Sequence, residues 1–158
     1  MNFGKKKGFV ATGGGAKCAF QAGCLLCFEE EFGITFDIMA GTSGGALNVL
    51  KYVESGAKAT VAVWHHFEKE GYSSIFSRFE AAKHYFGGPA LYGDKGLNKL
   101  VAGVDMAKVI TSPILMEIVA RNELTNKPQV IRNNDFKNTP QDRETFRRLI
   151  KASASFPG

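Results

Sequence analysis

The fold is decided by the stretch Phe36-Asp37-Ile38-Met39-Ala40-Gly41-Thr42-Ser43-Gly44-Gly45, in which a short apolar run meets a glycine turn. Residues 36–40 are predicted to form a strand. The apolar residues after Gly45 predict a helix to about Ser55, with Gly56 as its stop. The turn fits Gly-x-Ser-x-Gly, a pattern that lifts a serine hydroxyl to the N-terminus of a helix. We therefore predict that Ser43 is a nucleophile, with Gly41 and Gly45 supporting its turn.

A second glycine loop, Gly13-Gly14-Gly15, stands earlier in the chain. Residues 8–12 before it predict a short buried strand. Residues 16–32 after it predict a helix that is apolar nearly all round and therefore largely buried. Such a loop presents backbone N–H groups to an anion. The loop does not match a dinucleotide fingerprint, which needs glycine where Cys18 stands. It does not match a P-loop either, which needs serine or threonine at that position. We expect an oxyanion hole formed by Gly13, Gly14, Gly15 and Gly44, with Lys17 supporting the first loop.

The rest of the chain continues the alternation of strands and helices. Strands that alternate with helices predict a parallel-rich sheet with helices on both faces, a three-layer α/β/α arrangement, in one domain covering residues 1–158. A start signal, Thr139-Pro140, places an N-cap before a proline at the first helical position. The further predictions are helices over 57–86 and 96–103, a strand over 114–120, its hairpin partner over 129–132, and a final helix with Phe146, Leu149 and Ile150 on its apolar face.

Composition places few limits on function. The chain has 158 residues, of which 44% are apolar and 22% charged, as in ordinary globular domains. No apolar run is long enough to span a bilayer, and the basic start of the chain is followed by too short an apolar segment for a signal peptide. We therefore expect a cytoplasmic protein, with non-classical export left open. On charge alone we interpret the net charge of +5 as a solvated basic surface, although it would also suit an anionic membrane surface or a nucleic acid. No motif indicates nucleic acid.

Three cysteines, Cys18, Cys24 and Cys27, lie close together. Their odd number and the expected cytoplasmic location argue against a disulfide framework. Two leucines separate Cys24 from Cys27 within the apolar helix, so we interpret the cysteines as buried helix residues. No further ligands for a metal stand nearby. We predict neither a metal nor a cofactor, and the sequence does not indicate the oligomeric state.

Taken together, these motifs resemble the patatin-like phospholipase family. The resemblance is carried by residues 13–17, 23–25, 29–30, 36–37 and 41–48, and by the terminal Ala152-Ser153-Ala154-Ser155-Phe156-Pro157-Gly158. It implies a lipid acyl hydrolase with a Ser–Asp dyad, acting on phospholipid or other lipid esters without a metal. It also implies that Ser43 is the nucleophile and that Gly13–Gly15 form the oxyanion loop. Lys17 takes a position usually held by arginine, and Cys18 replaces a frequent glycine.

The catalytic aspartate of that family lies in an Asp-Gly-Gly/Ala motif, which residues 1–158 do not contain. Since a serine hydroxyl without a base is a poor nucleophile, the chain alone should be nearly inactive, and we expect it to be incomplete at its C-terminus.

The other acidic residues do not supply the missing base. Asp37 is interpreted as structural, and Asp94, Asp105, Asp135 and Asp142 have no motif context. His65, His66 and His84 lack the aspartate and spacing of a triad. The alternatives are an inactive lipid-binding or regulatory domain and, more distantly, a nucleotide-binding module.

An aromatic stretch runs from Trp64 to Phe86, with Lys69, Arg78 and Lys83 interleaved. Such a pattern is found in helices that lie at a membrane interface, which would make the protein a peripheral membrane protein. An ordinary helix with one face packed on the sheet explains the pattern equally well. Replacing Trp64 and Phe76 with serine would weaken vesicle binding in the first case.

Overall fold

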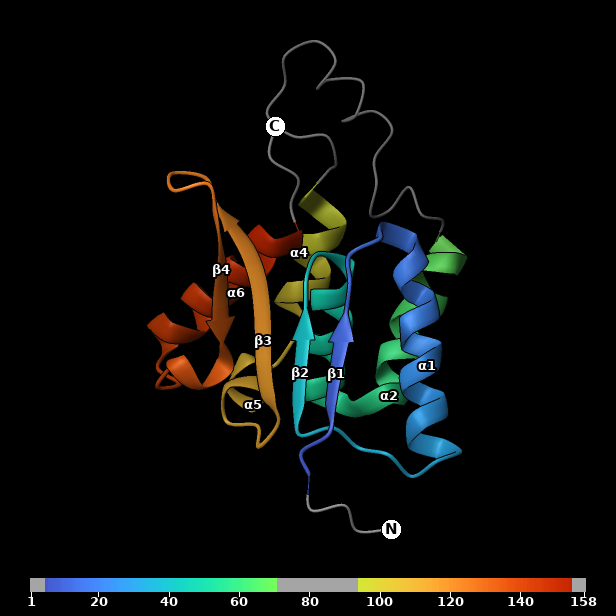
Figure 1. The fold of residues 1–158 in the computed structure, drawn as a ribbon. Helices are drawn as coiled ribbons and strands as arrows, with labels where there is room; N and C mark the ends of the chain where they lie inside the picture. Colours follow the sequence, from blue (N-terminus) through green and yellow to red (C-terminus); the bar gives the residue numbers. More distant parts are fainter. Residues whose placement is uncertain (1–4, 71–93, 155–158) are drawn as a thin grey trace.

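The computed structural model describes residues 5–70 and 94–154, which form a four-stranded sheet with helices packed against it (Figure 1). The strands are β1 (Gly8–Ala11), β2 (Ile38–Gly41), β3 (Leu115–Asn122) and β4 (Lys127–Arg132), in the order β1-β2-β3-β4. The first three strands run parallel, and β4 pairs with β3 in the antiparallel direction. Ala11 lies opposite Gly41, and Gly41 opposite Ile118, so the loops after β1 and β2 leave the sheet side by side. The predicted strands and hairpin are confirmed.

The helices follow the glycine loops and the later start signals. They are the 3-10 turn η1 (Gly15–Cys18), α1 (Ala19–Glu30), α2 (Gly44–Glu70), α4 (Asp94–Ala102), α5 (Met106–Ile110), the 3-10 turn η3 (Asn133–Asp135) and α6 (Pro140–Ala154). Gly56 interrupts α2 with a φ of 81°, which confirms the predicted break. The part of the predicted helix 57–86 that continues beyond Glu70 lies outside the described residues.

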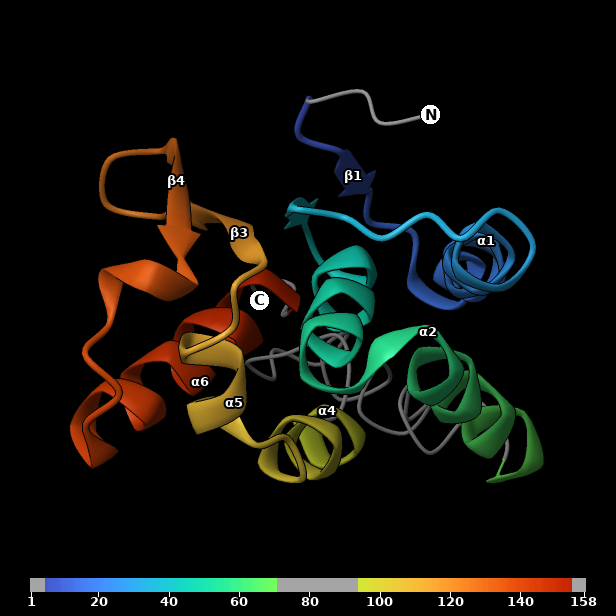
Figure 2. The same cartoon turned by 90° about the horizontal axis from the view of Figure 1, so that it is seen from below.

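The helices of the described segments lie on one side of the sheet (Figure 2). The face turned toward them carries the fully buried Met39, Met116 and Ile118. On β1 the neighbours of Val10 point toward the core, whereas Val10 itself is 74% exposed on the opposite face. The predicted α/β class, a parallel-rich sheet with helices packed against it, is confirmed. The helices of residues 5–70 and 94–154 cover one face of this sheet.

The first long helix is less buried than its composition predicts. In α1, Ala22 and Leu25 are fully buried, and the helix packs against α2. Phe20 is 78% exposed, and Cys27 is exposed as well. The expectation of a largely buried helix is therefore wrong. Apolar residues on all sides of a helix do not ensure that other elements cover every side. Because α1 lies beside the β1 edge of the sheet, part of its surface stays exposed (Figure 2).

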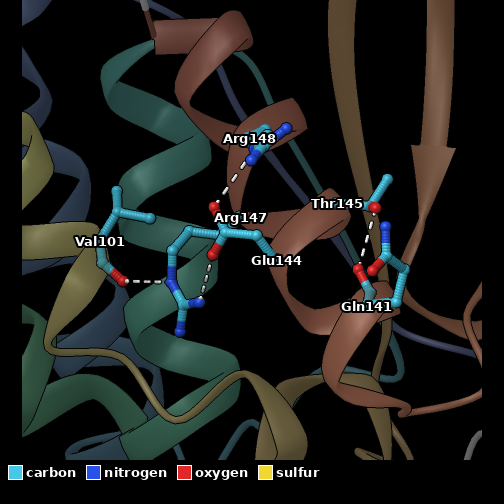
Figure 3. A network of polar contacts seen from close by, with 6 residues as sticks. All are labelled: Val101, Gln141, Glu144, Thr145, Arg147 and Arg148. Atoms are coloured by element: carbon cyan, nitrogen blue, oxygen red, sulfur yellow. Dashed lines mark hydrogen bonds and ion pairs between the residues drawn. The ribbon is translucent and has the colours of Figure 1, made fainter.

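The last helix, α6, is held in place at both ends. Thr139 caps its start, since the Thr139 hydroxyl accepts a hydrogen bond of 3.1 Å from the Asp142 N–H, as the Thr-Pro pair predicts. Farther along, Arg147 Nε donates to the Val101 carbonyl at the end of α4 (3.5 Å), and Arg147 also pairs with Glu144 (Figure 3). Phe146 and Ile150 are completely buried. These contacts carry the C-terminal end of α6 to the Ser43 turn.

Candidate active site

Ser43 lies in the turn between β2 and α2, at the carboxyl end of the parallel strands. Its φ of 54° is left-handed, which costs a residue with a side chain about 1–2 kcal/mol and is found at functional turns. The Ser43 carbonyl accepts hydrogen bonds from the N–H groups of Ala46 (2.9 Å) and Leu47 (3.3 Å), so α2 begins directly after the serine. Ser43 therefore stands at the partially positive N-terminus of a helix.

Close packing explains the three glycines around Ser43. A Cβ at Gly45 would lie 2.3 Å from the Ala11 carbonyl oxygen, in the neighbouring strand. A Cβ at Gly44 would lie 2.8 Å from Cys18 Sγ, and a Cβ at Gly41 would lie 2.8 Å from the backbone of α2. Any side chain here would push the β2–α2 turn away from β1 and η1. The glycines thus permit the two loops to meet.

The first glycine loop lies directly against the serine. A Cβ at Gly13 would be 3.0 Å from Ser43 Cβ and 3.7 Å from Ser43 Oγ. Gly15 has a φ of 55° and opens η1, where the Lys17 N–H donates to the Gly14 carbonyl (3.1 Å). The Lys17 side chain is exposed. The structure therefore brings together the two loops that the sequence singled out.

Several backbone N–H groups around Ser43 are unused. Within residues 5–70 and 94–154, the N–H groups of Gly13, Gly14 and Gly44 donate to no acceptor. The N–H of the residue after the nucleophile and an N–H from a neighbouring loop are the usual donors of an oxyanion hole in an elbow of this kind. The N–H of Ser43 itself is occupied, since it donates to Ser153 Oγ.

Ser153 of α6 makes a contact with Ser43 that the sequence did not predict. The Ser43 N–H donates to Ser153 Oγ (3.2 Å), and Ser153 Oγ donates to the Val119 carbonyl of β3 (2.7 Å). The Thr42 hydroxyl donates to the same carbonyl (3.2 Å). Residues 152–158 carry part of the family resemblance, but nothing in their pattern indicates that a hydroxyl reaches Ser43 from 110 residues away.

A buried asparagine holds the start of the first helix region against α2. The Asn48 amide donates to the Cys18 carbonyl (2.8 Å) and to Gln21 Oε1 (3.3 Å), and Gln21 donates in turn to the Thr12 carbonyl (2.8 Å). The Trp64 indole N–H donates to Asn48 Oδ1 (2.7 Å). Trp64 is thus half-buried and packed edge-on against Phe67, so it serves the interior. This network fixes the residues that flank the first glycine loop, and no motif in the sequence indicates it.

The acidic side chains singled out in the sequence are engaged elsewhere. Asp37 accepts a hydrogen bond from the Lys7 N–H (2.7 Å) at the opposite end of the strands, which agrees with a structural role. Asp105 caps the start of α5. Asp135 and Asp142 accept from nearby backbone N–H groups. Among the side chains that the structure describes, no carboxylate or imidazole contacts Ser43 Oγ; His84 and the side chain of Asp94 lie outside them.

The three cysteines are free, and they differ in burial. Cys18 is buried beside Gly44, and burial raises the pKa of its thiol. Cys24 is half-buried and Cys27 is exposed, so the prediction of three buried cysteines holds for Cys18 and is wrong for Cys27. In the described part of the chain, no group of three or more His, Cys, Asp or Glu side chains could hold a metal ion. No described helix is long and apolar enough to cross a membrane.

A serine on a left-handed turn between a parallel strand and a helix, facing a second loop with unused N–H groups, has the geometry of a nucleophile elbow in the α/β class of proteins. A comparison with protein families found that the model of the patatin-like phospholipases matches residues 9–158. The chain belongs to the patatin-like phospholipase family.

The chain is also similar to solved structures, at low sequence identity. VipD from Legionella pneumophila has 12% identity and a TM-score of 0.49, with 94% of this chain and 41% of that chain covered. The type III effector protein ExoU has 16% identity and a TM-score of 0.48, with 97% and 40% covered. ExoU in its complex with SpcU, from Pseudomonas aeruginosa, has 18% identity and a TM-score of 0.46, with 97% and 36% covered. The chain thus spans about two fifths of these proteins. A comparison with curated protein sequences found no match.

Proposed function

We propose that the protein is a serine acyl hydrolase that cleaves the acyl esters of phospholipids or other lipids. The observation that carries this proposal is the contact between the two glycine loops: the backbone of Gly13 lies against the side chain of Ser43, which sits on a left-handed turn. A structural glycine turn would not need a second loop with free N–H groups beside a serine hydroxyl.

In the proposed reaction, Ser43 Oγ attacks the acyl carbonyl carbon of the ester. The N–H groups of Gly13, Gly14 and Gly44 face the oxygen that becomes negatively charged, and the N-terminus of α2 adds its partial positive charge. The carbon–oxygen bond to the alcohol then breaks, and the alcohol or lysolipid leaves with the serine proton. Water attacks the acyl-serine and releases the fatty acid.

The proposal also requires a base for the Ser43 proton. By the family resemblance this base is an aspartate in an Asp-Gly-Gly/Ala motif, which the proposal places beyond Gly158. A carboxylate removed from water has a raised pKa, and this makes it a useful base near neutral pH. The end of α6 would lead to it, because Ser153 already lies beside Ser43.

One observation favours a second function, that of a non-catalytic lipid-binding domain. Among the described residues no acidic or imidazole group touches Ser43 Oγ, and without a base the N–H groups would bind a lipid ester oxygen without cleaving the ester. The two functions differ in hydrolysis. The full-length protein and its Ser43→Ala variant are compared on a soluble short-chain ester and on phospholipid vesicles. Hydrolysis that falls by about a thousandfold or more in the variant supports the enzyme. Equal rates contradict it.

A further inference from the structure

Two large apolar side chains are exposed at the end of the sheet that carries Ser43. Phe20, in the first turn of α1, directly follows the first glycine loop and is 78% exposed. Leu124, at the tip of the hairpin between β3 and β4, is 99% exposed. Since β3 continues from Ile118, opposite Gly41, to Asn122, this tip extends beyond the ends of β1 and β2 (Figure 1). The start of α1, which follows β1, and the hairpin tip, which follows β3, thus lie on opposite sides of the turn that follows the central strand β2 and carries Ser43.

Cations accompany both apolar side chains. Lys17 lies three residues before Phe20, and Arg121 and Lys127 stand on either side of the hairpin tip; all three are exposed. Within the described segments none of these cations forms an ion pair, and Glu123 is the acidic residue of the hairpin tip. The surface therefore combines isolated apolar side chains with a surplus of positive charge.

We propose that this surface, formed by Lys17, Phe20, Arg121, Leu124 and Lys127, docks the protein on an anionic phospholipid bilayer. This inference rests on the proposed function, because it takes the ester presented to Ser43 to belong to a lipid of the bilayer. Phe20 and Leu124 insert between lipids, and the cations lie at the anionic headgroups. A second copy of the chain fits this surface less well. A stable dimer needs about 800 Å² of complementary surface on each partner, and a twofold contact here would bring like charges together.

The expected effects follow from the two kinds of contact. An exposed phenylalanine or leucine gains part of its full burial energy at an interface, so replacing either with serine should weaken vesicle binding by about tenfold or less. Each lysine near an anionic surface contributes about fivefold to binding, and this contribution disappears at high salt. The double variant Phe20→Ser with Leu124→Ser should therefore lose most of the binding.

Binding is measured by sedimentation with vesicles of phosphatidylcholine alone or with added phosphatidylserine, and the full-length protein carries Ser43→Ala so that no lipid is consumed. The chain offers matched controls at the opposite end of the sheet. Phe32→Ser removes a side chain that is 67% exposed just beyond α1. The double variant Lys5→Gln with Lys6→Gln removes two exposed charges before β1. Its vesicle binding is compared with that of the double variant Lys17→Gln with Lys127→Gln.

The proposal predicts that the variants near Ser43 lose binding to the anionic vesicles and that the matched controls retain it. The proposal is overturned if the variants near Ser43 and the matched controls lose vesicle binding equally, or if neither set loses it. It is also overturned if the variants near Ser43 change the sedimentation coefficient of the protein, as the loss of a dimer would, without changing vesicle binding. A failure here is distinguishable from a failure of the proposed function. Hydrolysis of a soluble ester depends on Ser43 and not on docking, whereas docking of the Ser43→Ala protein does not depend on hydrolysis.

Discussion

The substitution Gly45→Ala tests the packing that brings the two glycine loops together. The added Cβ would lie 2.3 Å from the Ala11 carbonyl oxygen, 2.6 Å from the Ala11 carbonyl carbon and 2.6 Å from the Thr12 carbonyl oxygen. All three atoms belong to the backbone, so no rotation of a side chain can relieve the contacts. Relief requires that the start of α2 move away from the end of β1.

The size of the effect follows from this geometry. Overpacking at a single site costs about 1–3 kcal/mol, and occasionally more. Three backbone contacts below 3.0 Å place Gly45→Ala at the upper end of that range. Alanine recovers up to about 1 kcal/mol through its higher helix propensity, so a net loss of about 2 kcal/mol or more in the free energy of unfolding is expected. Gly23→Ala provides the matched control, because a Cβ at Gly23 on α1 would meet no atom within 4 Å. There the propensity gain of about 0.5–1 kcal/mol should appear alone.

Urea unfolding followed by circular dichroism measures the difference. The slope for a small protein is about 1–3 kcal/mol per molar urea, so a separation of about 3 kcal/mol corresponds to roughly 1–3 M between the two midpoints. In thermal unfolding the same separation corresponds to roughly 6–12 °C for a domain of this size. If the two variants unfold at the same midpoint, or if Gly45→Ala is as stable as the unsubstituted protein, then β1 and α2 do not approach each other as described.

Three further predictions concern the free energy of unfolding. Asn48→Leu should lower it by about 2–4 kcal/mol, because the Cys18 carbonyl and the Trp64 indole N–H lose a buried partner; a loss below 1 kcal/mol in urea titrations would show that the network is unimportant. Ser43→Gly should be more stable than Ser43→Ala by about 1–2 kcal/mol, because glycine adopts the φ of 54° without strain, and equal melting temperatures would contradict the left-handed turn. The pKa of the buried Tyr52 is raised, first by burial and then by the Glu29 carboxylate. The neutral phenol therefore contributes to the free energy of unfolding at pH values below its ordinary pKa of about 10, and this contribution is lost as the pH rises above that value. Between pH 9 and pH 11 the Tyr52→Phe variant should therefore lose less free energy of unfolding than the unsubstituted protein. Parallel pH profiles would refute this assignment.

The sequence predicted the parts of the fold that depend on local residues. Gly56 interrupts α2 because a helix cannot continue through a φ of 81°, and Thr139 caps α6 through a hydrogen bond to the backbone three residues later. The meeting of the two glycine loops was also predictable, because the carboxyl ends of adjacent parallel strands lie at one edge of a sheet. To predict each of these features, it is enough to know the residues of one short segment or of one pair of neighbouring strands.

The contacts that complete the site could not be predicted in the same way. Ser153 reaches Ser43 because α6 is anchored to α4 by Arg147 and to the core by Phe146, and none of these pairings leaves a mark in the local pattern. The exposure of Phe20 likewise depends on the position of α1 beside the β1 edge. Hydrophobic periodicity describes one helix, whereas exposure depends on every element around it.

Three elements hold the strained turn at Ser43, and two of them are distant from it in sequence. The Gly13 loop after β1 lies against its side chain, Ser153 of α6 accepts its N–H, and the first turn of α2 donates to its carbonyl. A left-handed residue that costs about 1–2 kcal/mol persists when its surroundings leave it no alternative, and here each backbone group of the serine has a partner. The position of the hydroxyl and of the free N–H groups is thus set by the fold before any ligand binds. In the proposed function, activity then depends on a base that takes the serine proton, and Ser153 places the end of α6 beside the position that this base would have to occupy.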